Sequence, residues 1–350
     1  MILFCLGFCY RLIRFVVVRF FYFQQFLLKR PKDLESAVIF GDELLSFVWK
    51  SSLKRVVFPY FKKGEVFVEL GGLSFFSPIT FSSFKGHPET LLSWIRMGLA
   101  GGSLKTIMDE DRSGNPRPRL QEVFLGDQKG LLNALGLPGK GVDYWINLFD
   151  TPLFNTGVPI GFSVGGDRVS DYLLVFNRLN QALLNRSFPY YFEINLSCPN
   201  TENGRKLADD PDQLSLLLDP IRTETDQLIS IKLSPDSSNA CLQQFVEVVR
   251  CYPNMLINIG NTTLRRCIDV GLDPMSISMG KGGLSGEPLF KRTLEMVTLL
   301  GPMGVPLMAT GGITSFDRVE AVLNQGACLI GVASALVMNP YEVASWGKRL

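Results

Sequence analysis

Histidine is almost missing from this sequence, with His87 the single example among 350 residues. Imidazole is the commonest general base in enzymes and the commonest metal ligand in proteins. Its scarcity argues against histidine-based catalysis and against histidine-ligated zinc. A lone histidine is more often a surface or hydrogen-bonded residue than a catalytic one, so we expect the acid–base chemistry to come from another residue type.

Paired cysteines and an excess of one charge are also lacking. The odd number of cysteines and the absence of any CxxC pair argue against a disulfide framework and against a zinc or iron–sulfur site. Reduced thiols in a compartment facing the cytosol fit this pattern best. The 35 Lys and Arg against 33 Asp and Glu give a net charge of +2, which is too balanced for a nucleic-acid-binding surface. We therefore expect no metal and no nucleic acid partner.

Apolar residues are concentrated in MILFCLGFCYRLIRFVVVRFFYFQQFLL, residues 1–28. A spanning helix needs about 20 residues almost free of charge, and arginines interrupt every window of that length. At 100° per residue, one arc of roughly 140° holds Arg11, Arg14, Arg19, Gln25 and Lys29, as in a helix that lies in the membrane interface.

This pattern predicts a peripheral or monotopic association with a bacterial cytoplasmic membrane or an organelle inner membrane. A spanning helix, a cleaved organelle presequence and an ordinary buried helix are the alternatives. A secretory signal is disfavoured because the apolar stretch leads into KRPKD rather than a small-residue cleavage site.

The rest of the N-terminal region alternates charged and apolar residues at helical spacing. Residues 31–61 predict two short helices, or one helix broken near Gly41-Asp42. The stretch EVFVELGGLSFF that follows predicts a β-hairpin around Gly71-Gly72. We expect residues 1–61 to form a membrane-associating and quinone-access region, and residues 62–350 to form the catalytic domain.

From about residue 78, short β-rich runs alternate with amphipathic stretches of helix length. The predicted strands lie near 79–82, 101–105, 159–163, 190–195, 228–232, 255–259, 305–309 and 327–331. Eight βα units in one chain of this size indicate an α/β fold, a (β/α)8 TIM barrel with a small N-terminal helical extension. The stretch 109–141 is too long for a simple connection and predicts a functional excursion over the barrel mouth.

The predicted strands end in uncharged hydrogen-bonding residues and two lysines. The set comprises Lys105-Thr106, Ser163, Asn195 with Cys198 and Asn200, Lys232, Asn261-Thr262-Thr263, Gly311-Gly312 and Ala333-Ser334. Such a ring suits a planar ligand with carbonyl and N–H groups and one anionic group. After the last two strands, ATGGI (309–313) and GVASA (331–335) place small residues where backbone N–H groups can approach a phosphate.

Five motifs occur here in an order and spacing that resemble the flavin-dependent dihydroorotate dehydrogenases. They are INLSCPNT (194–201), IKLSPD (231–236), GNTTL (260–264), GGLSGEPL (282–289) and ATGGI (309–313), and the resemblance covers about residues 65–345. It implies FMN across the mouth of the barrel. It also implies hydride transfer from C6 of dihydroorotate to flavin N5, while a loop residue removes the C5 proton.

On this resemblance the base is Cys198, between Ser197 and Pro199. A thiol with an ordinary pKa near 8.5 is mostly protonated at neutral pH. The reaction rate is therefore expected to rise with pH through the titration of this thiol.

The resemblance implies roles for other residues. The substrate would be bound by Lys105, Asn133, Asn195, Asn200, Asn261 and Thr262. FMN would be contacted by Ser82, Ser83, Lys105, Thr106, Ser163, Asn195, Lys232, Thr262, Ser285, Gly286, Gly311, Gly312, Ala333 and Ser334. Lys232 would stabilise the anionic reduced flavin through its charge.

The sequence resembles two classes of the family at once. Cys198 and the loop NALGLPGKG resemble the soluble class 1 enzymes, whereas the apolar N-terminus and GNTTL resemble the membrane-bound class 2 enzymes, in which a helical layer leads quinone to the flavin. Quinone is the favoured oxidant, because the chain offers neither a cysteine cluster nor a GxGxxG loop.

Two departures from the family pattern affect the substrate. Phe84 replaces a glycine after the first strand, and Ser163 replaces an asparagine. An FMN oxidoreductase for another dihydropyrimidine or enone-like substrate, and a membrane-associated scaffold barrel without flavin, therefore remain alternatives.

Overall fold

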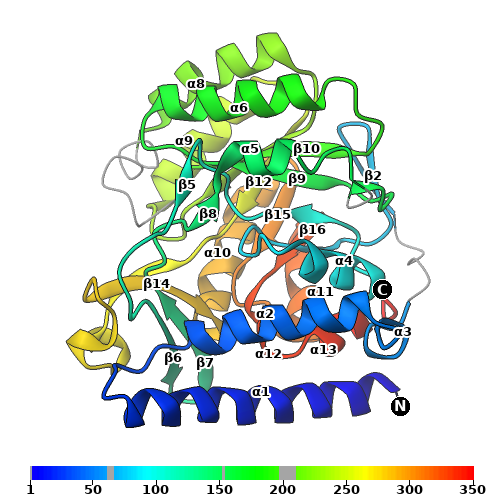
Figure 1. The fold of residues 1–350 in the computed structure, drawn as a ribbon. Helices are drawn as coiled ribbons and strands as arrows, with labels where there is room; N and C mark the ends of the chain where they lie inside the picture. The colour runs from blue at the N-terminus through cyan, green and yellow to red at the C-terminus, as the bar shows by residue number, and fades with distance from the viewer. Residues whose placement is uncertain (1, 61–66, 152–153, 197–209) are drawn as a thin grey trace.

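A closed barrel of eight parallel strands forms the centre of the computed structural model (Figure 1), which describes residues 2–60, 67–151, 154–196 and 210–350. Its strands, in order around the barrel, are β3 (Ile79–Phe81), β4 (Gly102–Ser103), β9 (Ile160–Val164), β10 (Tyr190–Asn195), β11 (Ile229–Leu233), β12 (Met255–Ile259), β15 (Leu307–Thr310) and β16 (Leu329–Val332). All eight predicted strands are confirmed. The barrel closes where β16 pairs with β3, with Ile330 opposite Ile79.

The strands are buried along their whole length because helices cover them outside and side chains fill them inside. In β10 every residue is buried, and its outward-facing Phe192 packs on Phe176 of α6 with ring centroids 4.8 Å apart. The inward-facing Glu193 is fully buried and accepts hydrogen bonds from Ser103 and Asn258. The barrel interior is therefore partly polar below the mouth.

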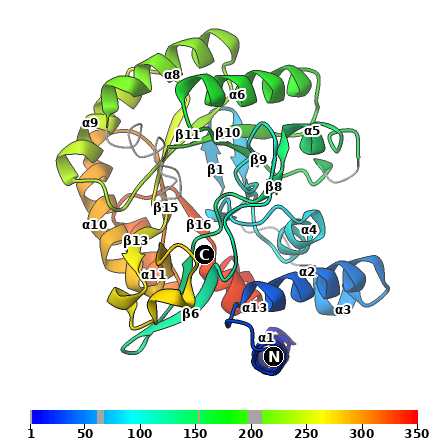
Figure 2. The same ribbon diagram turned by 60° about the vertical axis from the view of Figure 1, so that its left-hand side comes forward.

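Helices surround the barrel, as Figure 2 shows most clearly for α6, α8, α9 and α10. They are α4 (Pro88–Arg96), α5 (Gly141–Ile146), α6 (Val169–Leu183), α8 (Pro211–Glu224), α9 (Asn239–Val249), α10 (Phe290–Leu300), α11 (Phe316–Asn324), α12 (Ser334–Met338) and α13 (Pro340–Trp346). Short 3-10 helices are η2 (Ile268–Val270), η3 (Pro274–Ser276), η4 (Glu287–Leu289) and η5 (Gly301–Met303).

Smaller β elements sit at the two ends of the barrel. The predicted hairpin is present as β1 (Val68–Leu70) and β2 (Leu73–Phe75). The excursion over the mouth is itself folded: β5 (Asp111–Arg112) pairs with β8 (Gly139–Lys140), while β6 (Leu120–Leu125) and β7 (Gln128–Asn133) form a hairpin. This hairpin joins β14 (Lys281–Gly286) and β13 (Thr263–Arg266) in a four-stranded antiparallel sheet.

The N-terminal layer consists of α1 (Ile2–Leu27), α2 (Glu35–Lys50) and α3 (Lys54–Val57). Figure 1 shows α1 and α2 running antiparallel along one side of the barrel. The predicted break near Gly41-Asp42 does not occur, because α2 continues through both residues and ends instead at Ser51, whose backbone is extended. Asp42, within the helix, forms an ion pair with Lys85.

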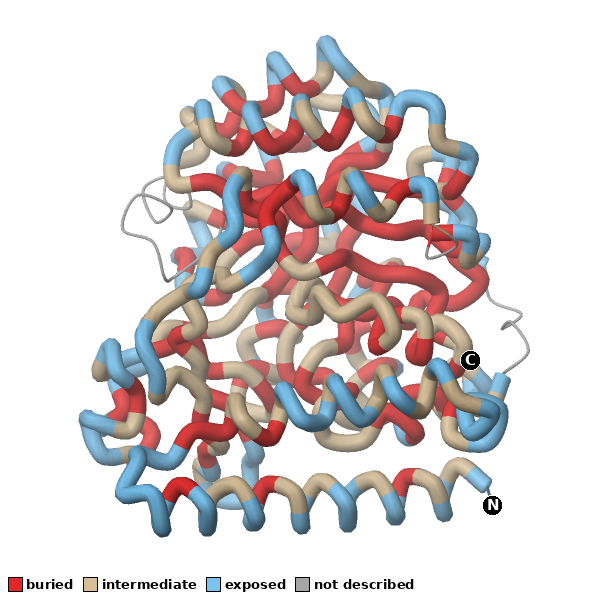
Figure 3. Tube along the Cα trace, viewed as in Figure 1, coloured by how far each residue is buried: buried red, intermediate tan, exposed pale blue. Residues whose placement is uncertain are grey.

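The two faces of α1 differ in exposure. The inward face is mixed: Val18 and Gln25 are buried, and Arg14, on the predicted polar arc, pairs with Glu122. The exposed residues are mostly apolar and include Phe4, Phe8, Leu12, Phe15, Val16, Phe20, Phe23, Phe26 and Leu27, together with Arg11 and Arg19. Figure 3 shows the outward face as the pale outer edge of the molecule. Over the residues that the structure describes, a search for helices with the length and hydropathy of a membrane span finds none.

Candidate active site

A cavity of about 1790 Å³ opens at the carboxyl ends of the barrel strands. It is walled by strand-end residues, by the excursion and by α2, which contributes Glu35, Val38 and Ile39. Pockets for single small ligands are typically about 300–1,000 Å³. The cavity therefore has room for a cofactor and a second ligand together.

The centre of the cavity floor is a network of side-chain hydrogen bonds. Asn195, at the end of β10, donates from Nδ2 to Thr106 Oγ1 over 2.8 Å and accepts from Asn261 Nδ2 over 3.4 Å. The Thr106 hydroxyl also bonds to that of Ser163 over 3.1 Å. Thr106, Asn195 and Asn261 line the cavity. Ser163 does not line it and contacts the site only through its hydrogen bond to Thr106. The network fixes the orientation of the amides that face a ligand.

Lys232 supplies positive charge at this floor. Its Nζ donates a hydrogen bond to Ser83 Oγ over 2.9 Å, and its side chain is buried. Among the described residues, the neighbouring Ser82 Oγ is buried without a hydrogen-bond partner, as is Thr310 Oγ1 on β15. Buried hydroxyls are normally hydrogen-bonded, so these two point to a polar ligand at the mouth.

Phe84, which replaces the glycine of the family pattern, packs against the hydrophobic core. Its ring stacks on Trp94 of α4 with centroids 5.4 Å apart and an interplanar angle of 22°. The next residue, Lys85, pairs with Asp42 of α2. The first loop is thus held by α4 and by the N-terminal layer, and both Ser82 and Ser83 remain in the cavity wall.

Small residues line the other side of the cavity. Gly311 and Gly312 have φ angles of +125° and +68°, and a Cβ at Gly312 would lie 2.4 Å from the Phe290 nitrogen. Only glycine fits this backbone without strain. Ala333 and Ser334 follow β16 directly and line the same wall, as do Ser285 and Gly286 of β14.

The excursion brings Asn133 to the cavity at the end of β7. Its Nδ2 donates to the Gly283 carbonyl over 3.1 Å, and a Cβ at Gly283 would lie 2.1 Å from Thr262 Oγ1. Lys105 lines the same cavity from β4's end. Asn133, Lys105, Asn195, Asn261 and Thr262 therefore converge on one space, as their sequence positions predict.

Two predicted site residues, Cys198 and Asn200, lie outside the described residues. The backbone that leads to them is well anchored, because the buried Tyr172 hydroxyl donates to the Asn195 carbonyl over 2.7 Å.

Sequence reasoning expected the N-terminal layer to lead to the flavin site, but it did not identify the charged residues that line the cavity. Glu35, Asp42 and the excursion residue Arg119 are all in its wall. The charged residues of 31–61 and the GNPRPRL stretch were visible signals, but nothing in the sequence said that they meet.

The barrel and its mouth define an oxidoreductase of the flavin-binding α/β barrel class, since the residues present fit FMN. Uncharged hydrogen bonders and a lysine suit the ring system, and the glycine-lined wall suits a phosphate. Residues 66–346 match the family model for dihydroorotate dehydrogenase.

Similar proteins agree with this match. The dihydroorotate dehydrogenase (quinone) of Chloroflexus aurantiacus is 30% identical over 267 residues, covering 70% of each chain. The catalytic subunit of dihydroorotate dehydrogenase B (NAD(+)) of Malacoplasma penetrans is 30% identical over 245 residues, covering 68% of this chain and 75% of that one. The crystal structure of the Eimeria tenella enzyme with ferulenol superposes with a TM-score of 0.72 at 21% identity, covering 89% of both chains.

The chain belongs to the dihydroorotate dehydrogenase family. It is an oxidoreductase for a CH–CH donor, and proteins of this family are FMN-dependent flavoproteins.

Proposed function

We propose that this protein oxidises dihydroorotate to orotate and passes the electrons to a quinone, with Cys198 as the base. The observation that carries the proposal is the convergence of Asn133, Asn195 and Asn261 with two lysines on one cavity. Amides match the carbonyl and N–H groups of a pyrimidine, and Lys105 offers a cation to its carboxylate.

FMN, when bound, supplies the electron acceptor for the C6 hydrogen of the substrate. The chain's own residues do the rest. The Asn195–Thr106–Asn261 network holds the substrate in one orientation, which lowers the entropic barrier to reaction. Lys232 holds a buried positive charge in the cavity wall, which would stabilise negative charge developing on the bound ring system. The Cys198 thiolate takes the C5 proton.

Two observations support quinone as the acceptor. The cavity continues from the strand ends to an apolar wall formed by Leu34, Val38 and Ile39 of the N-terminal layer together with Val337. Relatives of the quinone type are among the similar proteins, although relatives of the NAD(+) type are as well. The apolar wall favours an apolar oxidant.

Anaerobic reduction tests the reaction directly. Dihydroorotate should bleach the flavin absorbance of the purified protein, and a quinone should restore it faster than fumarate or NAD(+) does. The rate of bleaching should rise with pH through the thiol titration. A flavin that dihydroorotate leaves oxidised would refute the substrate, and a flat rate between about pH 6 and 9 would refute Cys198 as the base.

We further propose that the outward face of α1 binds a membrane surface. It exposes six phenylalanines at 56% or more, Phe4, Phe8, Phe15, Phe20, Phe23 and Phe26, with Arg19 over the Phe15 ring. Deletion of residues 1–28 should abolish sedimentation with vesicles of mixed neutral and anionic lipid while the barrel keeps its FMN. Undiminished sedimentation of the deleted protein would place the attachment elsewhere.

A further inference from the structure

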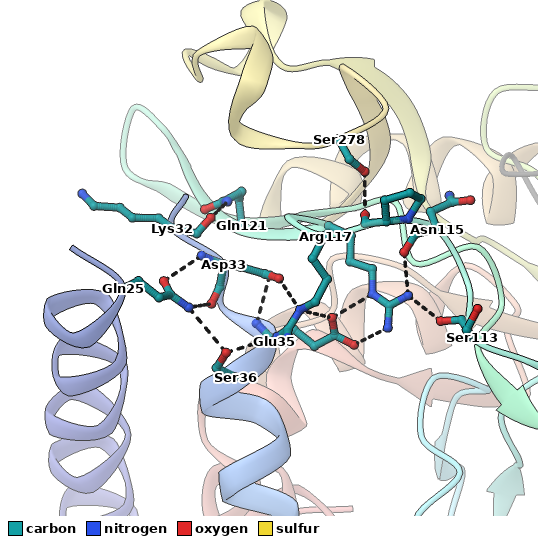
Figure 4. Close-up of polar contacts among 12 residues, drawn as sticks. Gln25, Lys32, Asp33, Glu35, Ser36, Ser113, Asn115, Arg117, Gln121 and Ser278 are labelled. Carbon is teal, nitrogen blue, oxygen red and sulfur yellow. Dashed lines mark hydrogen bonds and ion pairs between the residues drawn. The ribbon is translucent and has the colours of Figure 1, made fainter. Parts of the chain in front are cut away.

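An ion-pair cluster joins the N-terminal layer to the excursion over the barrel mouth (Figure 4). Glu35, the first residue of α2, pairs with Arg119 through two hydrogen bonds of 2.7 Å, one from Nε and one from Nη2. Arg117 adds contacts to Asp33 and to Glu35, at 2.6 and 2.9 Å. A bidentate arginine–carboxylate pair is both strong and geometrically specific.

The third nitrogen of Arg119 points the other way, into the excursion. Its Nη1 donates to the backbone carbonyls of Ser113 and Asn115, over 2.6 and 2.8 Å. The Arg119 guanidinium therefore contacts Glu35 of α2 on one side and the backbone carbonyls of Ser113 and Asn115 on the other.

The turn at Asn115 is bonded to the chain that carries Asn133. Asn115 Nδ2 donates to the Ala134 carbonyl over 2.9 Å, and the Asn115 backbone N–H donates to Leu135 over 3.0 Å. The Ala134 N–H in turn donates to the Arg119 carbonyl. Both residues that follow Asn133 are thus held by the segment that Glu35 orients.

Burial makes this arrangement sensitive to the loss of one partner. The side chains of Glu35 and Arg119 are only 13% and 12% exposed. Removing the Glu35 carboxylate takes the carboxylate partner from the mostly buried charge of Arg119, although the bonds to the Ser113 and Asn115 carbonyls remain, and such a loss costs more than the pair contributes. Lys105 is close enough to Glu35 for its charge to favour the carboxylate, and the two residues share the cavity wall with Asn133.

We propose that Glu35 is a positioning residue for dihydroorotate binding, acting through Arg119 and Asn115 on Asn133. This rests on the proposed function for the identity of the ligand. The N-terminal layer then has a second task besides contact with a membrane and a quinone: it sets the geometry of the substrate site. By linkage, a bound substrate also tightens the attachment of the layer.

The molecule contains a matched control. Arg14 of α1 pairs with Glu122 of β6, so this ion pair also ties the N-terminal layer to the excursion hairpin. It makes no contact with the turn at Asn115 among the described interactions. Glu35→Gln and Glu122→Gln each remove one negative charge from an ion pair between the layer and the excursion. Glu35→Gln also weakens the contact to Arg117, which keeps Asp33 as a partner, and only Glu35→Gln should disturb Asn133.

The experiment uses the full-length protein loaded with FMN. For Glu35→Gln we expect the KM for dihydroorotate and the Kd for orotate, read from the flavin spectrum, to rise about tenfold or more. The kcat should change less than about threefold, because the proposed role of Glu35 is to position a substrate-binding residue and not to take part in the chemical step. Glu35→Asp should recover part of the affinity, and Glu122→Gln should behave as the wild type.

Hydrogen exchange supplies a readout that needs no substrate. Backbone amides of residues 113–135 should exchange faster in Glu35→Gln than in Glu122→Gln, and Arg119→Lys should reproduce the Glu35→Gln pattern. Equal KM, Kd and exchange in the two Gln variants would overturn the proposal. A wild-type flavin that dihydroorotate leaves oxidised would instead overturn the proposed function, and the exchange result would stand separately.

Discussion

The barrel and the N-terminal layer differ in how much apolar surface holds them. The barrel packs rings and branched aliphatic side chains into a continuous core, with Phe162, Phe192 and Ile231 fully buried. The layer contacts the rest of the protein through a small apolar cluster that includes Val18, Leu34 and Ala37, and through the ion pairs Arg14–Glu122, Asp42–Lys85 and Glu35–Arg119. Burial of apolar surface dominates stability, and the layer buries much less of it than the barrel does. The layer should therefore loosen without unfolding the barrel.

A core substitution in the barrel is the strongest way to break this contrast. Phe192→Ala removes a ring packed on Phe176 and should lower the free energy of unfolding by about 3–5 kcal/mol. Phe23→Ala, at 61% exposure on α1, should change it by less than about 0.5 kcal/mol. Urea denaturation of the two variants gives the comparison. Similar losses in both would mean that α1 belongs to the same cooperative core.

Lys232→Ala tests the role of a charged side chain at the barrel mouth in FMN binding and flavin reduction. It removes a buried charge-assisted hydrogen bond to Ser83 and should weaken FMN binding or slow flavin reduction by ~1.5–3 kcal/mol. The measurements are FMN affinity by fluorescence quenching and the rate of reduction by dihydroorotate. Unchanged affinity and rate would remove Lys232 from its assigned role.

The sequence predicts the barrel better than it predicts the contacts of the N-terminal layer. The barrel was predictable because each strand is a short apolar run that ends in a polar loop, so both the eight strands and the residues at their ends are local signals. Asn195, Lys232 and Gly312 consequently stand where the sequence places them. These signals do not depend on distant contacts.

The remainder depends on partners far apart in the chain. Glu35 and Arg119 are 84 residues apart, and no local sequence pattern predicts that they form an ion pair. The hairpin of β6 and β7 completes its sheet with β14, about 150 residues later. The helix α2 continues through Gly41, and the next residue, Asp42, pairs with Lys85 of the first barrel loop; tertiary contacts of this kind override local propensity.

Acid should weaken the attachment of the layer through Glu35, and this is the smallest of the expected effects. Burial raises the pKa of Glu35, but the hydrogen bond and charge of Arg119, with the charges of Arg117 and Lys105, outweigh it and leave the pKa below its ordinary value of 4.5. A carboxyl group with a lowered folded pKa contributes stability above the unfolded pKa and loses it as pH falls through the folded value. The attachment should therefore be constant from pH 7 to about pH 5 and weaken below that. Burial also raises the pKa of Glu89, but hydrogen bonds from its own backbone and from Lys50 outweigh this and lower the pKa. Protonation of Glu89 in acid should therefore weaken the attachment as well.

The difference in urea midpoint or in proteolysis of the α1–α2 linker between the wild type and Glu35→Gln measures this attachment. The difference should be full at pH 7 and should shrink towards zero in acid, because protonation of Glu35 makes the wild type resemble the variant. Added salt at pH 7 should reduce it less, since both side chains are mostly buried and such pairs are poorly screened. A difference that persists unchanged below about pH 3 would show that the Glu35 carboxylate is not what joins the layer to the excursion.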